Sequence, residues 1–224
     1  MNPRNPHIAD IFAGLLVLFL AAWFAPDVTP GEAAYPQDSH YYLKTAQNIY
    51  NGVGYSGHDR LAEGQIWTDP EVMRGPLYPL TMAAAFSVMG YGMDTALALG
   101  SVLFVANAVV LFLLGRVLFG WRVGLLASLY LMFSSLTLFA GSVVMLDSLL
   151  ALLSLLTFLF YFLAARENRA LYFVLAGLSF GLAYLTKELA LLYLGLPFAL
   201  GAFIAGGLAA GTMLFLSERS GLKA

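Results

Sequence analysis

Long apolar runs alternate with short polar segments along most of the chain, and one long polar stretch near the N-terminus interrupts the alternation. A helix that crosses a membrane needs about 20 mainly apolar residues. We expect spans over the six runs that approach this length, residues 8–25, 95–115, 123–142, 148–165, 170–186 and 188–208. The pattern therefore predicts an all-α polytopic membrane protein with about six transmembrane helices.

The apolar stretch over residues 76–90 is short for a span and has the length of helices that rest in the membrane interface. Pro76 or Pro79 suits the first turn of such a helix, and Gly90 suits its end. Counting this stretch as a span would reverse the direction of every later helix. We therefore expect a juxtamembrane helix that lies along the outer surface.

The first and last apolar runs differ from the others. The first run is followed by Pro26 rather than by a small-residue cleavage site, so we expect an uncleaved first helix. The last run, over residues 189–217, carries no charge and is longer than one span requires. For this run we expect one helix that is tilted, or kinked near Gly206, Gly207 and Gly211.

Positive charges set the expected orientation, because Lys and Arg in short loops favour the cytoplasmic side. With the N-terminus in the cytoplasm, the short arginine-bearing loops fall inside and the long loop over residues 26–94 falls outside. The cations inside are then Arg4, Arg116, Arg122, Arg166, Arg169, Arg219 and Lys223. Those outside are Lys44, Arg60, Arg74 and Lys187.

Composition agrees with a membrane protein and excludes several kinds of chemistry. The 224 residues are 60% hydrophobic and 11% charged, whereas a soluble domain carries roughly 25% charged residues. A net charge of -2 argues against a nucleic-acid partner. The chain has no cysteine, and its three histidines lack the spacing of zinc ligands.

The long outer loop contains a polar helix with an acidic residue at its start. Asp38 can cap a helix that runs to Asn51, with Tyr42 on its apolar stripe. Gly52 and the glycines that follow it predict a turn. A capped surface helix with tyrosines seated at the interface explains this pattern without a catalytic role.

In the expected topology, two further charged residues lie on the outer face of the membrane. Asp147 lies at the outer start of one span and Lys187 at the outer end of the next, on the same face as Asp38 and Arg74. Charges at membrane depth indicate a functional site. The simpler interpretation is that they mark helix ends, with Lys187 reaching the interface or pairing with Glu188. The shared face favours a site.

Several short motifs follow one another along the chain. They are Asp38-x-x-x-Tyr42-x-x-x-Ala46-x-Asn48, Gly52-x-Gly54-Tyr55, Arg74-Gly75-Pro76-Leu77-Tyr78-Pro79, Gly115-Arg116-x-Leu118-Phe119-Gly120, Leu146-Asp147, and Gly177-Leu178-x-x-Gly181-Leu182-Ala183-x-Leu185-Thr186-Lys187. In this order they resemble the N-terminal half of the GT-C glycosyltransferases, polytopic enzymes that use polyprenyl-phosphate sugars. The group with protein O-mannosyltransferases and aminoarabinose lipid A transferases is the one they resemble most.

The resemblance implies an inverting transfer of a sugar from a polyprenyl-phosphate donor to an extracytoplasmic acceptor. Such an enzyme must bind the phosphate and deprotonate the attacking hydroxyl. The resemblance implies Asp38 as the catalytic base. The residues that it implies in substrate binding are the cations Lys187 and Arg74 for the phosphate, Asp147 as part of the pocket, and Tyr42, Tyr55 and Tyr78 as aromatic walls.

Two departures from the family pattern leave alternatives open. Ser39 stands where many members carry a second acidic residue, which argues against a mechanism with two carboxylates. Members are usually much longer, so we expect this chain to be an N-terminal part or to need a partner subunit. A non-catalytic membrane subunit of the same fold is one alternative. A small-molecule transporter is the other, although the chain lacks a visible repeat.

We expect residues 1–224 to form one GT-C-like transmembrane domain, with a first span over 8–25, an outer loop over 26–94 and further spans over 95–217. Its expected place is a bacterial-type inner membrane, with the active face outside. Expected partners are membrane lipid, the polyprenyl-phosphate sugar and an acceptor that is a protein, lipid or glycan. No metal ligand set is recognised, and a divalent metal requirement stays open.

Overall fold

The computed structural model describes residues 8–25, 37–56 and 75–196. Throughout these ranges the regular structure is helical. The chain forms two compact units, residues 1–188 and residues 189–224, and each is described by itself. The all-α fold class is confirmed for the described part of the chain.

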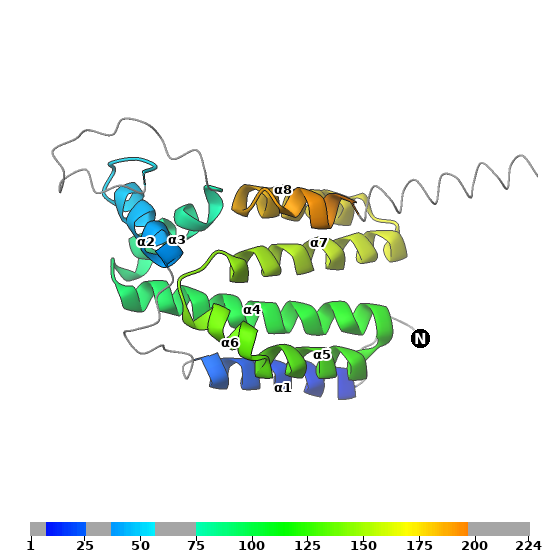
Figure 1. The fold of residues 1–224 in the computed structure, drawn as a ribbon. Helices are drawn as coiled ribbons and strands as arrows, with labels where there is room; N and C mark the ends of the chain where they lie inside the picture. The colour runs from blue at the N-terminus through cyan, green and yellow to red at the C-terminus, as the bar shows by residue number, and fades with distance from the viewer. Residues whose placement is uncertain (1–7, 26–36, 57–74, 197–224) are drawn as a thin grey trace, which may run out of the picture. The chain divides into compact units, whose positions relative to one another are not determined.

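Eight α-helices are described in the first unit, and Figure 1 shows their order. They are α1 (Ile8–Phe24), α2 (Gln37–Tyr50), α3 (Leu77–Met89), α4 (Met93–Phe119), α5 (Trp121–Phe133), α6 (Ser135–Ser142), α7 (Asp147–Glu167) and α8 (Ala170–Thr186). The described part of the second unit contains a short helical turn of π type, η2 (Leu191–Gly195). The expected kink at Gly206, Gly207 and Gly211 lies outside the described residues.

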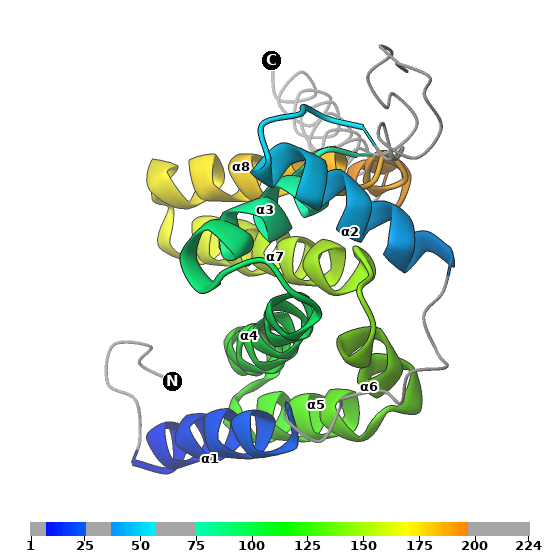
Figure 2. The same ribbon diagram turned by 90° about the vertical axis from the view of Figure 1, so that its left-hand side faces the viewer.

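Helix α4 is the central element of the first unit. It packs against α1 and α5 on one side and against α7 on the other, and α8 covers α7 (Figures 1 and 2). Helices α2 and α3 pack against each other, and α3 also contacts α4 and α8. Figure 1 shows the α2–α3 pair at the end of the unit where α4 begins.

Single helices agree with four of the six expected spans, namely α1, α4, α7 and α8, but their lengths do not confirm a count of six. By length and composition, α4 and α7 can each cross a membrane, and the bent pair α5–α6 counts as a third span if it is taken as one. Helices α1 and α8 have 17 residues each and fall among the shorter apolar helices. Helix α3 begins and ends as expected, between Pro76 and Gly90.

The expected span over residues 123–142 is not one continuous helix, because it is divided into α5 and α6. The chain is extended at Ser134, with φ -72° and ψ 123°, and the axes of α5 and α6 differ by 62°. Serine pairs are a known cause of sharp helix bends, because their hydroxyls compete with the backbone for hydrogen bonds. Ser134 and Ser135 form such a pair at the break.

Helix α1 buries its small residues and exposes its large ones. Ala13, Val17 and Ala21 are at most 4% exposed and pack with residues of α4 and α5. Large apolar side chains on its other face are well exposed, including Phe12 at 70% and Phe19 at 60%. Small residues at helix contacts and large apolar residues outside are typical of helices that face lipid, where close packing replaces the hydrophobic effect.

Two glycines bring α4 and α5 into backbone contact. A Cβ atom on Gly124 would lie 2.5 Å from the Phe112 carbonyl oxygen, and one on Gly115 would lie 2.7 Å from the Gly124 Cα. The Ser128 hydroxyl donates to the Ala108 carbonyl at 2.9 Å and adds a polar contact to the same crossing. This tight crossing fixes the direction in which the chain turns after α4.

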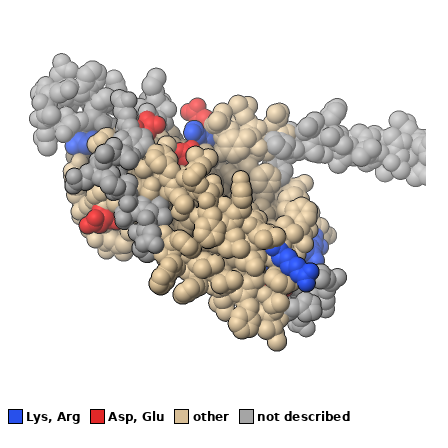
Figure 3. All heavy atoms as spheres, turned by 60° about the horizontal axis from the view of Figure 1, so that its bottom comes forward, with Lys and Arg blue, Asp and Glu red and all other residues tan. Residues whose placement is uncertain are grey.

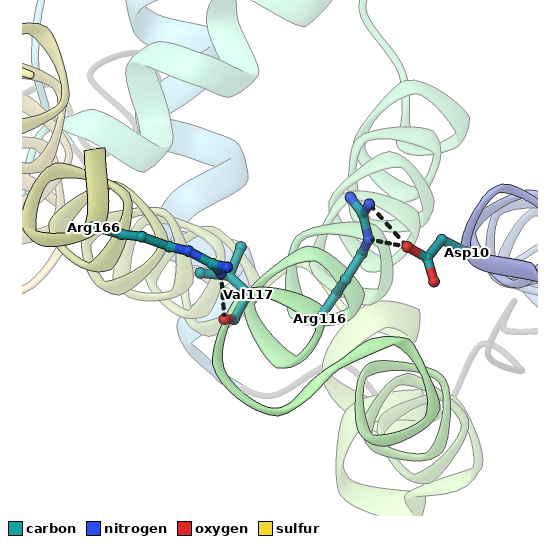
Figure 4. A network of polar contacts seen from close by, with 4 residues as sticks. All are labelled: Asp10, Arg116, Val117 and Arg166. Carbon is teal, nitrogen blue, oxygen red and sulfur yellow. Dashed lines mark hydrogen bonds and ion pairs between the residues drawn. The ribbon is translucent and has the colours of Figure 1, made fainter. Parts of the chain in front are cut away.

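The arginine-bearing loops meet at one end of the first unit (Figure 4). Arg116 on α4 donates to Asp10 on α1, at 3.1 Å for the shorter contact, and the Asp10 side chain is only 13% exposed. Arg166 at the end of α7 donates to the Val117 carbonyl at 3.2 Å. Figure 3 shows uncharged surface between basic side chains at one end of this face and the acidic and basic side chains at the other.

Replacing Gly124 with leucine should destabilise the helix bundle. The added side chain collides with backbone atoms of α4, and such overpacking costs about 1–3 kcal/mol. Thermal unfolding of the purified protein in detergent should therefore begin at a lower temperature. Gly177→Ala on α8 is the matched control, because a Cβ there meets nothing within 4 Å. Equal unfolding temperatures for Gly124→Leu and wild type would contradict the tight crossing.

Candidate functional site

The end of α8 meets the start of α7 through an ion pair. Lys187 Nζ lies 3.5 Å from Asp147 Oδ1, and the two side chains are 43% and 41% exposed. Lys187 directly follows α8, and Asp147 is the first residue of α7. The sequence placed both residues at the outer ends of neighbouring spans, and the structure brings them into contact.

Gly75 holds the start of α3 against the end of α8. A Cβ atom at this position would collide with the Leu185 and Thr186 carbonyl oxygens and would lie 2.7 Å from the Thr186 carbonyl carbon. A glycine is therefore required for this approach. Pro76 then caps α3, and its carbonyl accepts a hydrogen bond from the Leu80 amide. This contact places the segment that begins α3 beside Lys187.

Tyr78, in the first turn of α3, is completely buried. Its hydroxyl has no hydrogen-bond partner among the described residues. Burial is the largest cause that raises the pKa of Tyr78 far above its usual value, followed by the charges of Tyr42 and Asp147. The phenol therefore keeps its proton at physiological pH, and Asp147 is the carboxylate that acts on it.

Helix α2 joins this cluster through Tyr42. The Tyr42 ring is 4% exposed and meets the Tyr78 ring edge to face, with centroids 5.3 Å apart. Asp38 lies one helical turn before Tyr42, in the first turn of α2. Helix α2 begins at Gln37, one residue before the expected start, so Asp38 lies in its first turn. A carboxylate in the first turn still interacts favourably with the helix dipole.

The turn after α2 explains the glycines of the second motif. Gly52 and Gly54 have φ angles of 73° and 110°, which residues other than glycine rarely adopt. Asn48 donates to the Ser56 carbonyl at 2.7 Å and ties this turn back to α2. The turn therefore holds Tyr55, which is half-buried, close to the end of α2.

The structure links some of the expected site residues and leaves others undescribed. Tyr42 contacts Tyr78 on one side, and Lys187 pairs with Asp147 on the other. Arg74 lies outside the described residues, although its neighbour Gly75 is placed. In the described ranges, no group of three or more His, Cys, Asp or Glu side chains could hold a metal ion.

The residue beside Asp38 has an unexpected environment. Ser39 is completely buried, and its hydroxyl has no hydrogen-bond partner in the described part of the chain. An acidic side chain at this position would be desolvated, which favours the neutral acid. The local packing thus accommodates a small neutral residue at this position.

Asn107 is a buried polar residue that the sequence interpretation missed. It lies on α4 and donates to the Leu103 and Ser148 carbonyls, each at 2.8 Å. The Ser148 hydroxyl donates to the Ala140 carbonyl at 3.0 Å, so α4, α6 and α7 are linked directly beside Asp147. A lone asparagine in an apolar run was a signal for such a role, because polar residues within spans bond across helices.

A bundle of apolar helices with charges gathered at two opposite ends defines an integral membrane protein. A family model described as dolichyl-phosphate-mannose-protein mannosyltransferase matches residues 73–215. Because this match covers more than half of the chain, the protein belongs to this family of GT-C glycosyltransferases. The match includes Asp147 and Lys187 but not Asp38. No curated protein and no solved structure matches the chain.

Replacing Gly75 with valine should separate α3 from the end of α8. The new side chain collides with two backbone carbonyls that cannot move without disturbing α8. We expect a lower unfolding temperature, since overpacking of this kind costs about 1–3 kcal/mol. Gly92→Ala is the matched control, because its Cβ meets nothing within 4 Å and its backbone is extended. A Gly75→Val protein as stable as wild type would show that this contact is dispensable.

Proposed function

We propose that the chain acts in an inverting transfer of a sugar from a polyprenyl-phosphate carrier to an acceptor outside the cytoplasm. The observation that carries the proposal is the meeting of Lys187 and Asp147 beside the start of α3, within the part that matches the mannosyltransferase family. A lysine at the end of an apolar helix can reach the phosphate of a lipid whose chain lies in the bilayer. Arg74 is proposed as a second phosphate ligand.

Asp38 is proposed as the base that takes the proton from the acceptor hydroxyl. It belongs to α2, which packs on α3 at the end of the bundle that holds Asp147 and Lys187. A base placed there can meet an acceptor from water and a donor from lipid. The hydroxyl oxygen attacks the anomeric carbon as the bond from that carbon to the phosphate oxygen breaks, so the polyprenyl phosphate leaves and the anomeric carbon is inverted. Tyr42, Tyr55 and Tyr78 are proposed to shape the sugar or prenyl site.

Asp38→Asn should abolish turnover while it leaves the fold intact. The variant keeps the shape of the side chain but removes its basicity, and losing a general base costs on the order of 10²–10⁴ in rate. The assay reconstitutes the whole chain in liposomes with polyprenyl-phosphate mannose and hydroxyl-bearing peptide or lipid acceptors. It measures the transfer of labelled sugar.

Asp94→Asn is the control for the loss of a carboxylate in a first helical turn, since Asp94 holds that position in α4. It should leave the rate unchanged. A folded wild-type chain that binds the donor but transfers no sugar would favour the non-catalytic subunit instead. Unfolding of the Asp38→Asn variant would return Asp38 to a purely structural role.

We further propose that α2 and α3 face outward and that the loops with Arg116 and Arg166 face the cytoplasm. The natural chain has no cysteine, so single cysteines report cleanly on each side. Val53→Cys, where the side chain is 40% exposed, should react with a membrane-impermeant maleimide in intact cells. Ala170→Cys, at the exposed start of α8, should react only after lysis. The reverse pattern would refute the orientation.

A further inference from the structure

We propose that α3 contacts the bilayer through an apolar stripe on its exposed face, so that α3 lies between α2 and the lipid. The stripe consists of Leu80, Ala84 and Val88. The inference needs only that the bundle lies in a membrane, and it does not depend on the proposed function. It separates two helices for which the sequence predicted similar places at the membrane surface.

The first argument is that α3 uses opposite faces for two different contacts. Tyr78, Met82 and Phe86 are buried and recur every four residues. The Tyr78 and Phe86 rings meet the rings of Tyr42 and Tyr50 on α2 edge to face, with centroids 5.3 and 6.2 Å apart. The stripe has the same spacing but begins two residues after Tyr78, which is about 200° around a helix. It therefore points away from α2.

The second argument is that the stripe is open and offers nothing to water. Val88 is 85% exposed, and Leu80 and Ala84 are exposed as well. Helix α3 carries no charged residue. The Thr81 and Ser87 hydroxyls donate to carbonyls one turn earlier in the same helix, at 2.8 and 3.0 Å, and so need no water. An uncharged helix with an exposed apolar face suits lipid as its surroundings.

The third argument is the surface that borders the stripe. Helix α3 packs against α4 and α8, and the exposed residues Met89, Tyr91 and Met93 lead from its end into α4. Val102, further along α4, is 61% exposed and faces lipid in a membrane-embedded bundle. Tyr91 stacks on Tyr50 with centroids 6.4 Å apart, and tyrosines are enriched where hydrocarbon meets water. The stripe thus continues the lipid-facing surface of the bundle.

The contact also sets the depth of the candidate site. Gly75 ties the start of α3 to the end of α8, and Lys187 follows that end directly. A helix that rests in the interface lies at the boundary between headgroups and acyl chains. Lys187 is then held near the level of lipid phosphates. This consequence, unlike the contact itself, rests on the proposed function, because only a lipid-linked donor makes use of that depth.

Single cysteines test the contact, because the natural chain has none. In liposomes, a bimane label on Val88→Cys or Ala84→Cys should be quenched by lipids that carry a nitroxide on the acyl chain, and it should be protected from iodide in the water. A nitroxide near the headgroup should quench more than one near the chain end. Val102→Cys on α4 is the control that faces lipid. His40→Cys, on the exposed face of α2, should be quenched by iodide alone.

A charge on the stripe gives an energetic test. Val88→Asp should lower the unfolding temperature of the whole protein in liposomes, because a carboxylate in contact with lipid is costly. His40→Asp adds the same charge on α2 and should leave the unfolding temperature unchanged. An exposed valine that faces water would tolerate aspartate, so equal unfolding temperatures for the two variants would contradict the contact.

Two labelling results would overturn the inference. Quenching of the Val88 and Ala84 labels by iodide would show that the stripe faces water. Quenching by neither agent would show that protein covers it, such as a second copy of this chain. Both results leave the proposed function standing, since that function is judged by sugar transfer. A chain that transfers no sugar would likewise leave the lipid contact standing.

Discussion

The backbone contact between Gly75 and the end of α8 is the interaction on which the arrangement of the site depends. It joins a segment of the long outer loop to a helix that lies more than a hundred residues later in the chain. The contact holds the first turn of α3, which carries Tyr78, beside the residue that precedes Lys187. A glycine is needed because two carbonyl oxygens occupy the space of a side chain. The geometry of the site thus depends on a residue that has no side chain.

The same use of small residues recurs through the bundle. In lipid, apolar side chains gain nothing by leaving their surroundings, so helices associate through close packing and polar contacts between backbones. Gly115 and Gly124 allow the backbones of α4 and α5 to touch. The buried alanines of α1 likewise allow that helix to pack closely against its neighbours. The large side chains are left for the outer surface, where they contact lipid. These close helix contacts hold in place the end of the unit where the charged residues lie.

The sequence predicted the helices far better than it predicted their details. Apolar length and flanking Pro or Gly located α3, α4, α7 and α8 within a few residues, because burial in lipid demands complete helices. The break at Ser134 was missed, since a local competition between hydroxyl and backbone leaves the apolar pattern unchanged. Helical periodicity alone does not locate such a break.

The site residues were predicted as a set, but their environments were not. Membrane topology predicted that Asp147 and Lys187 lie on the same face, and in the structure their side chains are 3.5 Å apart. Neither the full burial of Tyr78 nor that of Ser39 followed from the sequence, because both depend on how α2 packs against α3. The role of Asp38 as a base remains a prediction.

Two ion pairs lie at opposite ends of the unit, and they differ in distance and burial. Arg116 holds Asp10 through two nitrogen atoms at 3.1 and 3.3 Å, and the carboxylate is mostly buried. Removing Arg116 would leave the mostly buried Asp10 carboxylate without its partner, so the pair acts as a link between α1 and α4. Lys187 and Asp147 meet at 3.5 Å with water within reach of both. A lysine is a single flexible charge, and its exposed pair exchanges partners easily. The proposed binding and release of a donor phosphate needs such a partner, and of these two ion pairs the Lys187–Asp147 pair suits that role.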